Sequence, residues 1–305
     1  MPYICFYNTE NFFPPNTPHL PHWDDRKYLT KRQKITQVFS LMKTQYHQLP
    51  TLIGLAEIGN KKVVKELLDM PVFEGKYSYV HYESQDERGI DVALAYQKSV
   101  FRMVHSEPIR FTFEMLNAQQ HFYTDTTRDV LYVILETQGI KIHYFLVHLP
   151  SKRENDINLD KRNHILSEIK KRIETIIYDT NEAVVISGDF NENPNEDNMQ
   201  NFIYYQGIEQ ILDNPFLKMY YQKQYSTFHH KTGLLFDQIL LSHHFFKPDF
   251  PLHYQQSKIF TPKEILQRQS IAPKPSRTYS GTRYLGGYSD HFPVLLFYDE
   301  DKNHL

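Results

Sequence analysis

Short runs of β-branched and aromatic residues recur along almost the whole chain, and polar or helical stretches separate them. Runs of this length and composition are typical of β-strands. The sequence therefore predicts nine strands, at residues 3–7, 51–57, 77–82, 91–96, 130–136, 141–148, 183–188, 237–242 and 293–298.

Helical periodicity is clearest at residues 31–45, 61–70 and 160–177. In the last segment, isoleucines at 165, 169, 173 and 176 are three or four residues apart, which predicts one apolar helix face. Asp160 near its start suits the helix dipole. The strands outnumber the helices and occur both as adjacent pairs and separated by helices, which indicates an α/β fold with mixed sheets.

Two polar, proline-containing stretches interrupt this pattern, at about residues 14–26 and 247–288. Long stretches of this kind inside a compact domain are commonly functional loops or lids. We therefore expect a single domain over residues 1–305 with two elaborated loops.

Composition excludes several kinds of protein. The formal net charge of −2 gives no global footprint of a nucleic-acid binder, although a local basic patch would suffice. The single cysteine rules out a disulfide framework and a thiolate zinc site. No apolar run reaches membrane-spanning length, and the first strand begins where a signal peptide would stand. We expect a soluble monomer and leave its compartment open, cytoplasmic or secreted.

Polar residues stand at the boundaries of six predicted strands, where sheet ends converge to form sites in many α/β proteins. They are Asn8, Glu57, His148, Asp189, Asn191, Asp237, Asp290 and His291. Within "GDFNENP", two-residue spacing places Asp189 and Asn191 on one side of a strand end and Phe190 on the other. The alternative for this segment is an Asx-rich turn.

These residue types suit one chemistry. Oxygen ligands without thiolates favour Mg²⁺, with Mn²⁺ or Ca²⁺ as possible substitutes, over zinc. Histidines beside carboxylates act as general acids or bases, or donate hydrogen bonds to a phosphoryl group. Together these groups favour the attack of water on a phosphorus ester.

The motifs "FYNTENFF", "IGLAEIGN", "LVHLPSK", "GDFNENP", "FDQILLS" and "YSDHFPV" resemble, in this order, those of the endonuclease/exonuclease/phosphatase superfamily. The resemblance covers nearly the whole chain. It implies a DNase-like α/β fold, a four-layer sandwich of two packed mixed β-sheets flanked by helices.

The resemblance also implies roles for the residues at the strand ends. Glu57 would be the principal Mg²⁺ ligand, with Asn8 and Asp290 close by. Asp189 would orient or deprotonate the attacking water, helped by Asn191. His291 would contact the scissile phosphate and be oriented by Asp237, and His148 would be a second histidine at that phosphate, with Glu83 as its candidate partner.

Four further residues are candidates for substrate binding. Arg128 matches an arginine that in DNase-like members approaches the substrate backbone. Arg88 precedes a strand near the expected site, although a salt bridge with Asp86 or Glu87 would also explain it. Arg283 and Tyr284 lie in the loop "SRTYSGTRYLGGYSDH", where interleaved arginines and tyrosines can grip phosphates and stack on bases.

The sequence thus favours a Mg²⁺-dependent hydrolase of phosphoric esters, and first a nuclease that cleaves DNA or RNA. The second hypothesis is a phosphatase or phospholipase-type enzyme acting on a small phosphate ester, an inositol phosphate or a lipid headgroup. It draws on the near-neutral charge and on Glu10, an acid where the DNase branch has a basic residue, since an acid repels phosphate. The third hypothesis is a binding module without catalysis, against which the intact set of residues argues.

Overall fold

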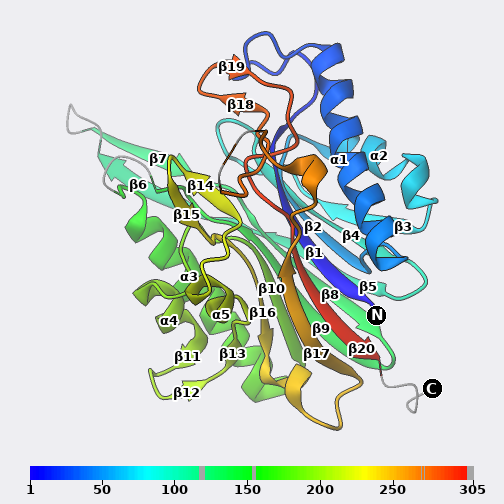
Figure 1. Ribbon diagram of the computed structural model, residues 1–305. Helices are drawn as coiled ribbons and strands as arrows, with labels where there is room; N and C mark the ends of the chain where they lie inside the picture. Colours follow the sequence, from blue (N-terminus) through cyan, green and yellow to red (C-terminus); the bar gives the residue numbers. More distant parts are fainter. Residues whose placement is uncertain (117–120, 153–155, 269, 271, 301–305) are drawn as a thin grey trace.

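Two six-stranded sheets pack face to face in the computed structural model, and helices cover both outer faces (Figure 1). The structure describes residues 1–116, 121–152, 156–268, 270 and 272–300. Among these residues, no helix is long and apolar enough to cross a membrane.

The first sheet, called sheet A below, has one parallel strand pair at its centre, β1 with β2, and antiparallel pairs elsewhere. Its strands, in spatial order, are β17 (Leu252–Ile259), β20 (Val294–Glu300), β1 (Tyr3–Phe12), β2 (Leu52–Ile58), β4 (Asp91–Gln97) and β3 (Tyr77–His81).

The second sheet, called sheet B below, has the same plan. Its one parallel strand pair is β9 with β10, and its other pairs are antiparallel. Its spatial order is β13 (Leu212–Asp213), β16 (Asp237–Ser242), β10 (Ala183–Asp189), β9 (Ile140–His148), β8 (Val130–Thr137) and β5 (Arg102–Ile109).

Four small hairpins complete the strands. Three of them gather at the end of the sandwich opposite the chain termini (Figure 1), namely β6–β7 (Thr112–Leu116, Phe122–Thr126), β14–β15 (Thr227–His229, Thr232–Leu234) and β18–β19 (Tyr279–Ser280, Arg283–Tyr284). The fourth is β11–β12 (Tyr204–Tyr205, Glu209–Gln210).

The helices form the outer layers. On sheet A lie α1 (Asp25–Tyr46), which Asp24 caps by accepting from the backbone N–H of Lys27, and α2 (Lys61–Leu68). On sheet B lie α3 (Leu159–Thr175) and α4 (Asp197–Ile203), and α5 (Phe216–Tyr221) follows. Short helical turns occupy Pro71–Phe73, Ile176–Thr180, His243–Phe246 and Lys263–Ile265.

Three hydrophobic clusters fill the three spaces between the four layers. One joins α1 and α2 to sheet A, the second lies between the sheets, and the third joins α3 and α4 to sheet B. The third contains Ile165, Ile169 and Ile173, which confirms the apolar face predicted for this helix. A helix–sheet–sheet–helix order with one buried cluster per interface confirms the predicted four-layer α/β sandwich.

The prediction of a long loop at 247–288 was wrong in part, because this stretch contains strand β17 at the edge of sheet A. Its centre, "YQQSK", is polar and partly exposed, as an edge strand with one neighbour permits, so its hydrophobic pattern is weak. Strand β5 was missed for a related reason, since it is an edge strand with four consecutive exposed residues and a proline. The other predicted loop ends at Asp24, where α1 is capped.

The two sheets approach closely at Gly54 of β2. A Cβ atom at this position would lie 2.7 Å from Leu146 Cδ1 of β9 and 3.1 Å from Ser187 Oγ of β10. Real side chains avoid the shorter of these distances. The absence of a side chain at Gly54 therefore allows the observed spacing of the sheets three residues before Glu57.

Candidate active site

The polar residues predicted from the strand ends meet at the end of the sandwich where the three hairpins gather. Strands β1, β2, β9 and β10 run towards this end, whereas β16 and β20 begin there. Side chains alternate between the two faces of a strand. On the face that points between the sheets, the apolar residues of the strand are followed, at the end of the sandwich, by a polar residue. Phe6 lies two residues before Asn8, Leu146 two residues before His148, and Ile239 two residues after Asp237. These three apolar residues lie in the core between the sheets.

The residues from sheet B stand in one row. Asp189 pairs in register with His148 on one side and with Asp237 on the other. Directly opposed residues on neighbouring strands point to the same face, so all three side chains face sheet A. All three are buried.

Sheet A supplies Glu57 in a different way. The register of β2 shifts between Ala56 and Ile58, and that of β1 shifts between Asn8 and Phe12. Glu57 has a φ of 60°, and Glu10 and Asn11 in β1 have φ values of 49° and 56°. A bulge of this kind turns a side chain away from the face that alternation would give it. Left-handed backbone is unfavourable for residues other than glycine and is commonly retained at functional sites.

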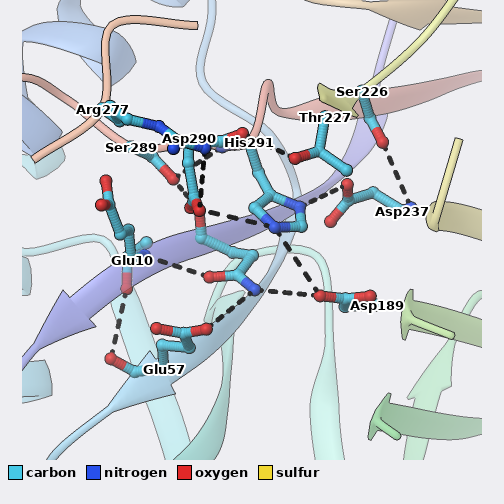
Figure 2. Close-up of polar contacts among 12 residues, drawn as sticks. Glu10, Glu57, Asp189, Ser226, Thr227, Asp237, Arg277, Ser289, Asp290 and His291 are labelled. Carbon is cyan, nitrogen blue, oxygen red and sulfur yellow. Dashed lines mark hydrogen bonds and ion pairs between the residues drawn. The ribbon is translucent and has the colours of Figure 1, made fainter. Parts of the chain in front are cut away.

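Asn8 connects the two halves of the site. Its Nδ2 atom donates to Asp189 Oδ2 at 3.0 Å and lies 3.4 Å from Glu57 Oε1. The second Glu57 oxygen accepts from the backbone N–H of Asn11 at 2.8 Å. Figure 2 shows Glu57, Asp189, Asp290 and His291 close together.

His291 is oriented by Asp237. The His291 Nδ1 atom lies 2.7 Å from Asp237 Oδ2, and Nε2 lies 3.9 Å from Asp189 Oδ2 and 3.8 Å from Asp290 Oδ1 (Figure 2). Burial opposes the positive charge of His291, but Asp237, Asp290 and Asp189 outweigh it and hold the pKa of His291 well above its usual value. His291 is therefore an imidazolium near neutral pH.

His148 has the opposite electrostatic character. Burial, and then the charges of Arg128, His291 and Arg88, hold the pKa of His148 well below its usual value. Its Nε2 atom lies 3.7 Å from Asp189 Oδ2. Two histidines in opposite protonation states thus flank one carboxylate, which is a common arrangement for dividing acid and base roles.

Asp189 is the centre of this group. Burial, followed by the nearby Asp237, raises the pKa of Asp189 to about 7, although His291, the Asn191 N–H and the Asn8 amide oppose the shift. A carboxyl group with a pKa near the working pH is well suited to general-base catalysis.

Asn191 reaches the site by a turn. Strand β10 ends at Asp189, Phe190 packs in the outer core against Phe202, and Asn191 has a φ of 51°. The Asn191 N–H donates to Asp189 Oδ1 at 3.0 Å, and its side-chain amide donates to the Leu149 carbonyl at 2.9 Å. The turn places the backbone N–H of Asn191, rather than its side-chain amide, on Asp189.

Arg128 lies beside this turn. Its guanidinium donates to the same Leu149 carbonyl at 3.2 Å and lies 3.8 Å from the Asp86 carboxylate. Arg88 is partly exposed next to it, and its backbone N–H, not its side chain, contacts Asp86. The alternative explanation of Arg88 as a salt-bridge partner of Asp86 was therefore wrong, since Arg128 takes that role.

Three of the residues predicted from the sequence, Glu83, Arg283 and Tyr284, lie away from the side chains that surround Asp189. The pairing of Glu83 with His148 was wrong: Glu83 is exposed, and His148 Nδ1 has no hydrogen-bond partner among the described residues. Arg283 is exposed on the β18–β19 hairpin. The Tyr284 ring packs against Trp23 and Tyr279 at centroid distances of 6.3 and 5.5 Å, so it supports the hairpin.

Glu10 does not face the site as a free acid. Its carboxylate accepts from the backbone N–H groups of Thr278 and Tyr279, at 2.5 and 2.9 Å. Buried Lys31 of α1 donates to Thr278 Oγ1 and, at 2.6 Å, to the Tyr288 carbonyl. Burial raises the pKa of Glu10 to about 7 and lowers that of Lys31 to about 8. The two groups fasten the loop that leads into Asp290 and His291.

Three residues beside the site were not among the predicted site residues. Ser289 Oγ donates to the Asn8 carbonyl at 2.7 Å and accepts from the His291 N–H at 3.0 Å. The guanidinium of Arg277 lies 3.7 Å from the Asp290 carboxylate. His19, in the loop before α1, is close enough for Arg88 and Glu57 to affect its pKa. Their positions depend on loop conformation, so the sequence carried little signal for them.

Two sets of side chains could hold a divalent cation. Asp189, Asp237 and His291 each offer a ligand atom within 4.8 Å of the others, but His291 Nδ1 is already hydrogen bonded to Asp237. In the second set, Glu57 and Asp290 offer carboxylate oxygen atoms, and the bulge in β2 directs the Glu57 carboxylate into the site. The Asn8 amide oxygen accepts from the Glu10 N–H at 3.0 Å, so it would ligate a cation only after giving up that bond. The chemistry of this second set fits Mg²⁺.

The family model "Endonuclease/Exonuclease/phosphatase family" matches residues 3–300. The chain therefore belongs to this family of phosphoesterases, as its motifs indicated. A comparison with curated proteins gives no match.

Solved structures similar to this chain have the same fold. A mannosyl-6-phosphatase of Bacteroides thetaiotaomicron is 15% identical with a TM-score of 0.60, and the match covers 98% of this chain and 99% of that one. D. rerio TDP2 complexed with a single-stranded DNA product is 17% identical with a TM-score of 0.58, over 98% of both chains. The catalytic domain of human Nocturnin is 16% identical with a TM-score of 0.59, over 98% of this chain and 95% of that one.

Proposed function

We propose that this protein is a divalent-metal-dependent hydrolase that cleaves phosphodiesters of nucleic acid. The arrangement of side chains around Asp189 is the observation that supports this proposal. One buried carboxylate with a pKa raised to about 7 lies within 4 Å of a cationic and a neutral histidine and accepts a hydrogen bond from an asparagine that also contacts Glu57.

Each residue has a role that follows from its surroundings. Asp189 takes a proton from the attacking water, whose oxygen bonds to phosphorus as the bond to the leaving oxygen breaks. His291, cationic and held by Asp237, and His148 donate hydrogen bonds to the phosphate oxygens. Glu57, Asn8 and Asp290 would hold Mg²⁺, which neutralises developing negative charge when bound. Asn191 fixes Asp189 through its N–H, Arg128 supports the same turn through the Leu149 carbonyl, and Arg88, which forms no ion pair with an acid among the described residues, attracts the substrate backbone.

The first test is hydrolysis of bis(4-nitrophenyl) phosphate with Mg²⁺ or Mn²⁺. We expect Asp189→Asn to lower the rate by about 10³-fold, because general-base catalysis contributes about 10² to 10⁴-fold. Asp249→Asn, an exposed acid on the short turn before β17, is the matched control and should retain full activity. If the wild-type protein is inactive, or Asp189→Asn is as active as the wild type, the hydrolase proposal fails and the binding-module hypothesis gains.

The second candidate is a phosphatase acting on a small phosphate ester. The formal net charge of −2 and the acids Asp86, Glu87 and Asp125 beside Arg128 favour it. The argument from Glu10 no longer supports it, because that carboxylate is satisfied by backbone N–H groups. The similar structures include both a phosphatase and a protein with bound DNA product.

Substrate comparison separates the two candidates. Nicking of supercoiled plasmid and degradation of a single-stranded oligonucleotide are measured beside phosphate release from mannose 6-phosphate and inositol phosphates. We expect turnover of the nucleic acids to exceed that of the monoesters. The reverse order would establish the phosphatase.

A further inference from the structure

A cavity of about 470 Å³ lies next to the candidate active site and has no role in the chemistry described above. It is formed between the β14–β15 hairpin and the loop segment at residues 274–285. Its walls include Phe228, His229, His230, Lys274, Arg277 and Leu285.

The wall of this cavity is continuous with the site. Arg277 lines the cavity and reaches to 3.7 Å from the Asp290 carboxylate. Thr227, which directly precedes Phe228, forms a β-bridge with His291 and donates to the Asp290 carbonyl at 2.8 Å (Figure 2). The cavity wall therefore borders the segment that carries Asp290 and His291.

Charge distinguishes this cavity from two others. None of its described lining residues is acidic, whereas Lys274, Arg277 and two histidines are basic. A cavity of about 290 Å³ beside Arg128 contains three acids, and two of its cations are ion-paired, Arg128 with Asp86 and Lys161 with Asp125. A cavity of about 710 Å³ near α5 and β17 includes no predicted site residue in its lining. Of these three cavities the first is therefore the best suited to an anion, through Lys274, although its Arg277 is ion-paired with Asp290.

The lining also offers planar and apolar surface. Phe228 forms one wall, the rings of His229 and His230 lie 4.4 Å apart, and Leu285 is 48% exposed. The Lys274 ammonium lies 5.4 Å from the Phe228 ring centroid and donates to the His230 carbonyl at 2.6 Å, so it is fixed beside the ring. An aromatic face beside a cation is a general means of binding a base and its phosphate.

We infer that this cavity binds the nucleotide adjoining the scissile phosphate. The base lies against Phe228 and the histidines, and Lys274 and Arg277 contact the next phosphate. The volume is within the range of small-ligand sites. This inference rests on the proposed function and narrows its substrate to phosphodiesters with an aromatic base and a second phosphate.

The test compares a substrate that fills the cavity with one that does not. The protein variants are Lys274→Met and Phe228→Leu, with Lys231→Met as the matched control. Lys231 is exposed at the tip of the same hairpin and lies outside the cavity. The substrates are a ten-nucleotide single strand and bis(4-nitrophenyl) phosphate, which has aromatic rings but no second phosphate.

We expect Lys274→Met to lower kcat/KM for the oligonucleotide about tenfold, as the loss of a charged hydrogen bond predicts. Phe228→Leu should lower it about fivefold through lost stacking. Lys274→Met should hydrolyse bis(4-nitrophenyl) phosphate at the wild-type rate, because this substrate has no second phosphate, and that rate also shows that the variant is folded. Thermal unfolding should show that Phe228→Leu is folded. Lys231→Met should change kcat/KM for the oligonucleotide by less than about twofold, since it contacts no cavity wall.

For Lys274→Met, equal losses on both substrates, no loss on either, or the same loss in Lys231→Met would overturn the inference while leaving the hydrolase proposal in place. A larger effect of Lys274→Met on a sugar monophosphate than on the oligonucleotide would also overturn it. Binding of the dinucleotide pTpT, measured by calorimetry in EDTA, gives a readout without catalysis. There too Lys274→Met should weaken binding about tenfold relative to Lys231→Met, even if the wild-type protein hydrolyses nothing.

Discussion

The two sheets contribute to the candidate site by different structural means. Sheet B places His148, Asp189 and Asp237 by regular pairing, with no change of register along β9, β10 and β16. Sheet A places Glu57 by a bulge, at a φ of 60°. The proposed acid–base half of the site is thus an extension of regular strands, whereas the proposed metal half departs from them.

Alternation explains this difference. Leu55 packs against the helices and Ala56 faces the other sheet, so an unbulged Glu57 would point towards α1 and α2. Ile58 takes that outward position instead, and Glu57 becomes the extra residue that turns into the site. Backbone strain is therefore expected at Glu57 itself, whereas in the acid–base half it falls outside the strand, at Asn191 in the turn after Asp189.

The largest effect expected from this comparison concerns metal dependence. Glu57→Gln and Asp189→Asn should each lower phosphodiester hydrolysis, by about 10² and 10³-fold, because one weakens metal binding and the other removes the base. Raising the Mn²⁺ concentration should restore much of the activity of Glu57→Gln and little of that of Asp189→Asn. Metal titrations of initial rates measure this, and equal rescue of both variants would refute the division into two halves.

The next effect concerns Lys31 and Glu10, which fasten the loop before Asp290. Lys31→Met should destabilise the protein by about 3–5 kcal/mol, because it leaves a buried carboxylate without its compensating charge. The double variant Lys31→Met/Glu10→Gln should recover part of this loss. Urea unfolding of both single variants and the double variant gives a double-mutant cycle for the free energy of unfolding. If the losses in the two single variants add up to the loss in the double variant, the two groups are independent.

A buried acid outside the site should make sheet B sensitive to pH. Burial raises the pKa of Asp129 to about 6, so the folded state binds this proton more tightly than the unfolded chain. The stabilising effect of the proton is complete below about pH 4 and is lost as pH rises through about 6. Asp129→Asn should therefore stabilise the protein by about 2–3 kcal/mol at pH 8 and hardly at pH 4. Asp299→Asn, exposed on β20, is the control for urea unfolding at both pH values, and an equal gain at both would contradict the assignment.

The smallest effect tests the backbone directly. Glu57→Gly should be more stable than Glu57→Ala by about 1 kcal/mol, since glycine relieves the left-handed conformation. At Asp189, which lies in regular strand, the order should reverse, with Asp189→Gly less stable than Asp189→Ala by about 0.5–1 kcal/mol. Thermal and urea unfolding of these four variants compare the halves, and the same order at both positions would show that strain within the strands is not confined to sheet A.

The sequence predicted sheet B's contribution better than sheet A's for the same physical reason. Where alternation continues to the strand end, as at His148 and Asp189, the side-chain direction follows from counting residues. The direction of Glu57 depends on a bulge, and that of Glu10 on a neighbouring bulge that turns it towards Thr278. Neither bulge has a glycine or another local sequence signal, so nothing in the sequence indicated that Glu10 binds backbone N–H groups, and the use of Glu10 as an argument against nucleic acid loses its support.

Contacts between distant loops were equally hard to predict. Glu83 was proposed as the partner of His148 by its place in the sequence, but its side chain is exposed at the end of β3. The edge-to-face packing of Tyr284 against Trp23 joins segments more than 250 residues apart, so no local pattern indicates it. Strand β17 lacks strong alternation because it is an edge strand.

The missing side chain at Gly54 has a consequence for how the site could diversify. Any substrate of this site must react in the gap between Glu57 and Asp189. The side-chain amide of Asn8 spans this gap, because it contacts both carboxylates. Loops such as the β14–β15 hairpin can vary in length and composition without changing that gap. A Cβ atom at position 54 would meet Leu146 Cδ1 at 2.7 Å, so a larger residue there would displace side chains between the sheets close to that gap. The loops are therefore the better place to change the specificity of this protein, since they can be altered without disturbing the gap.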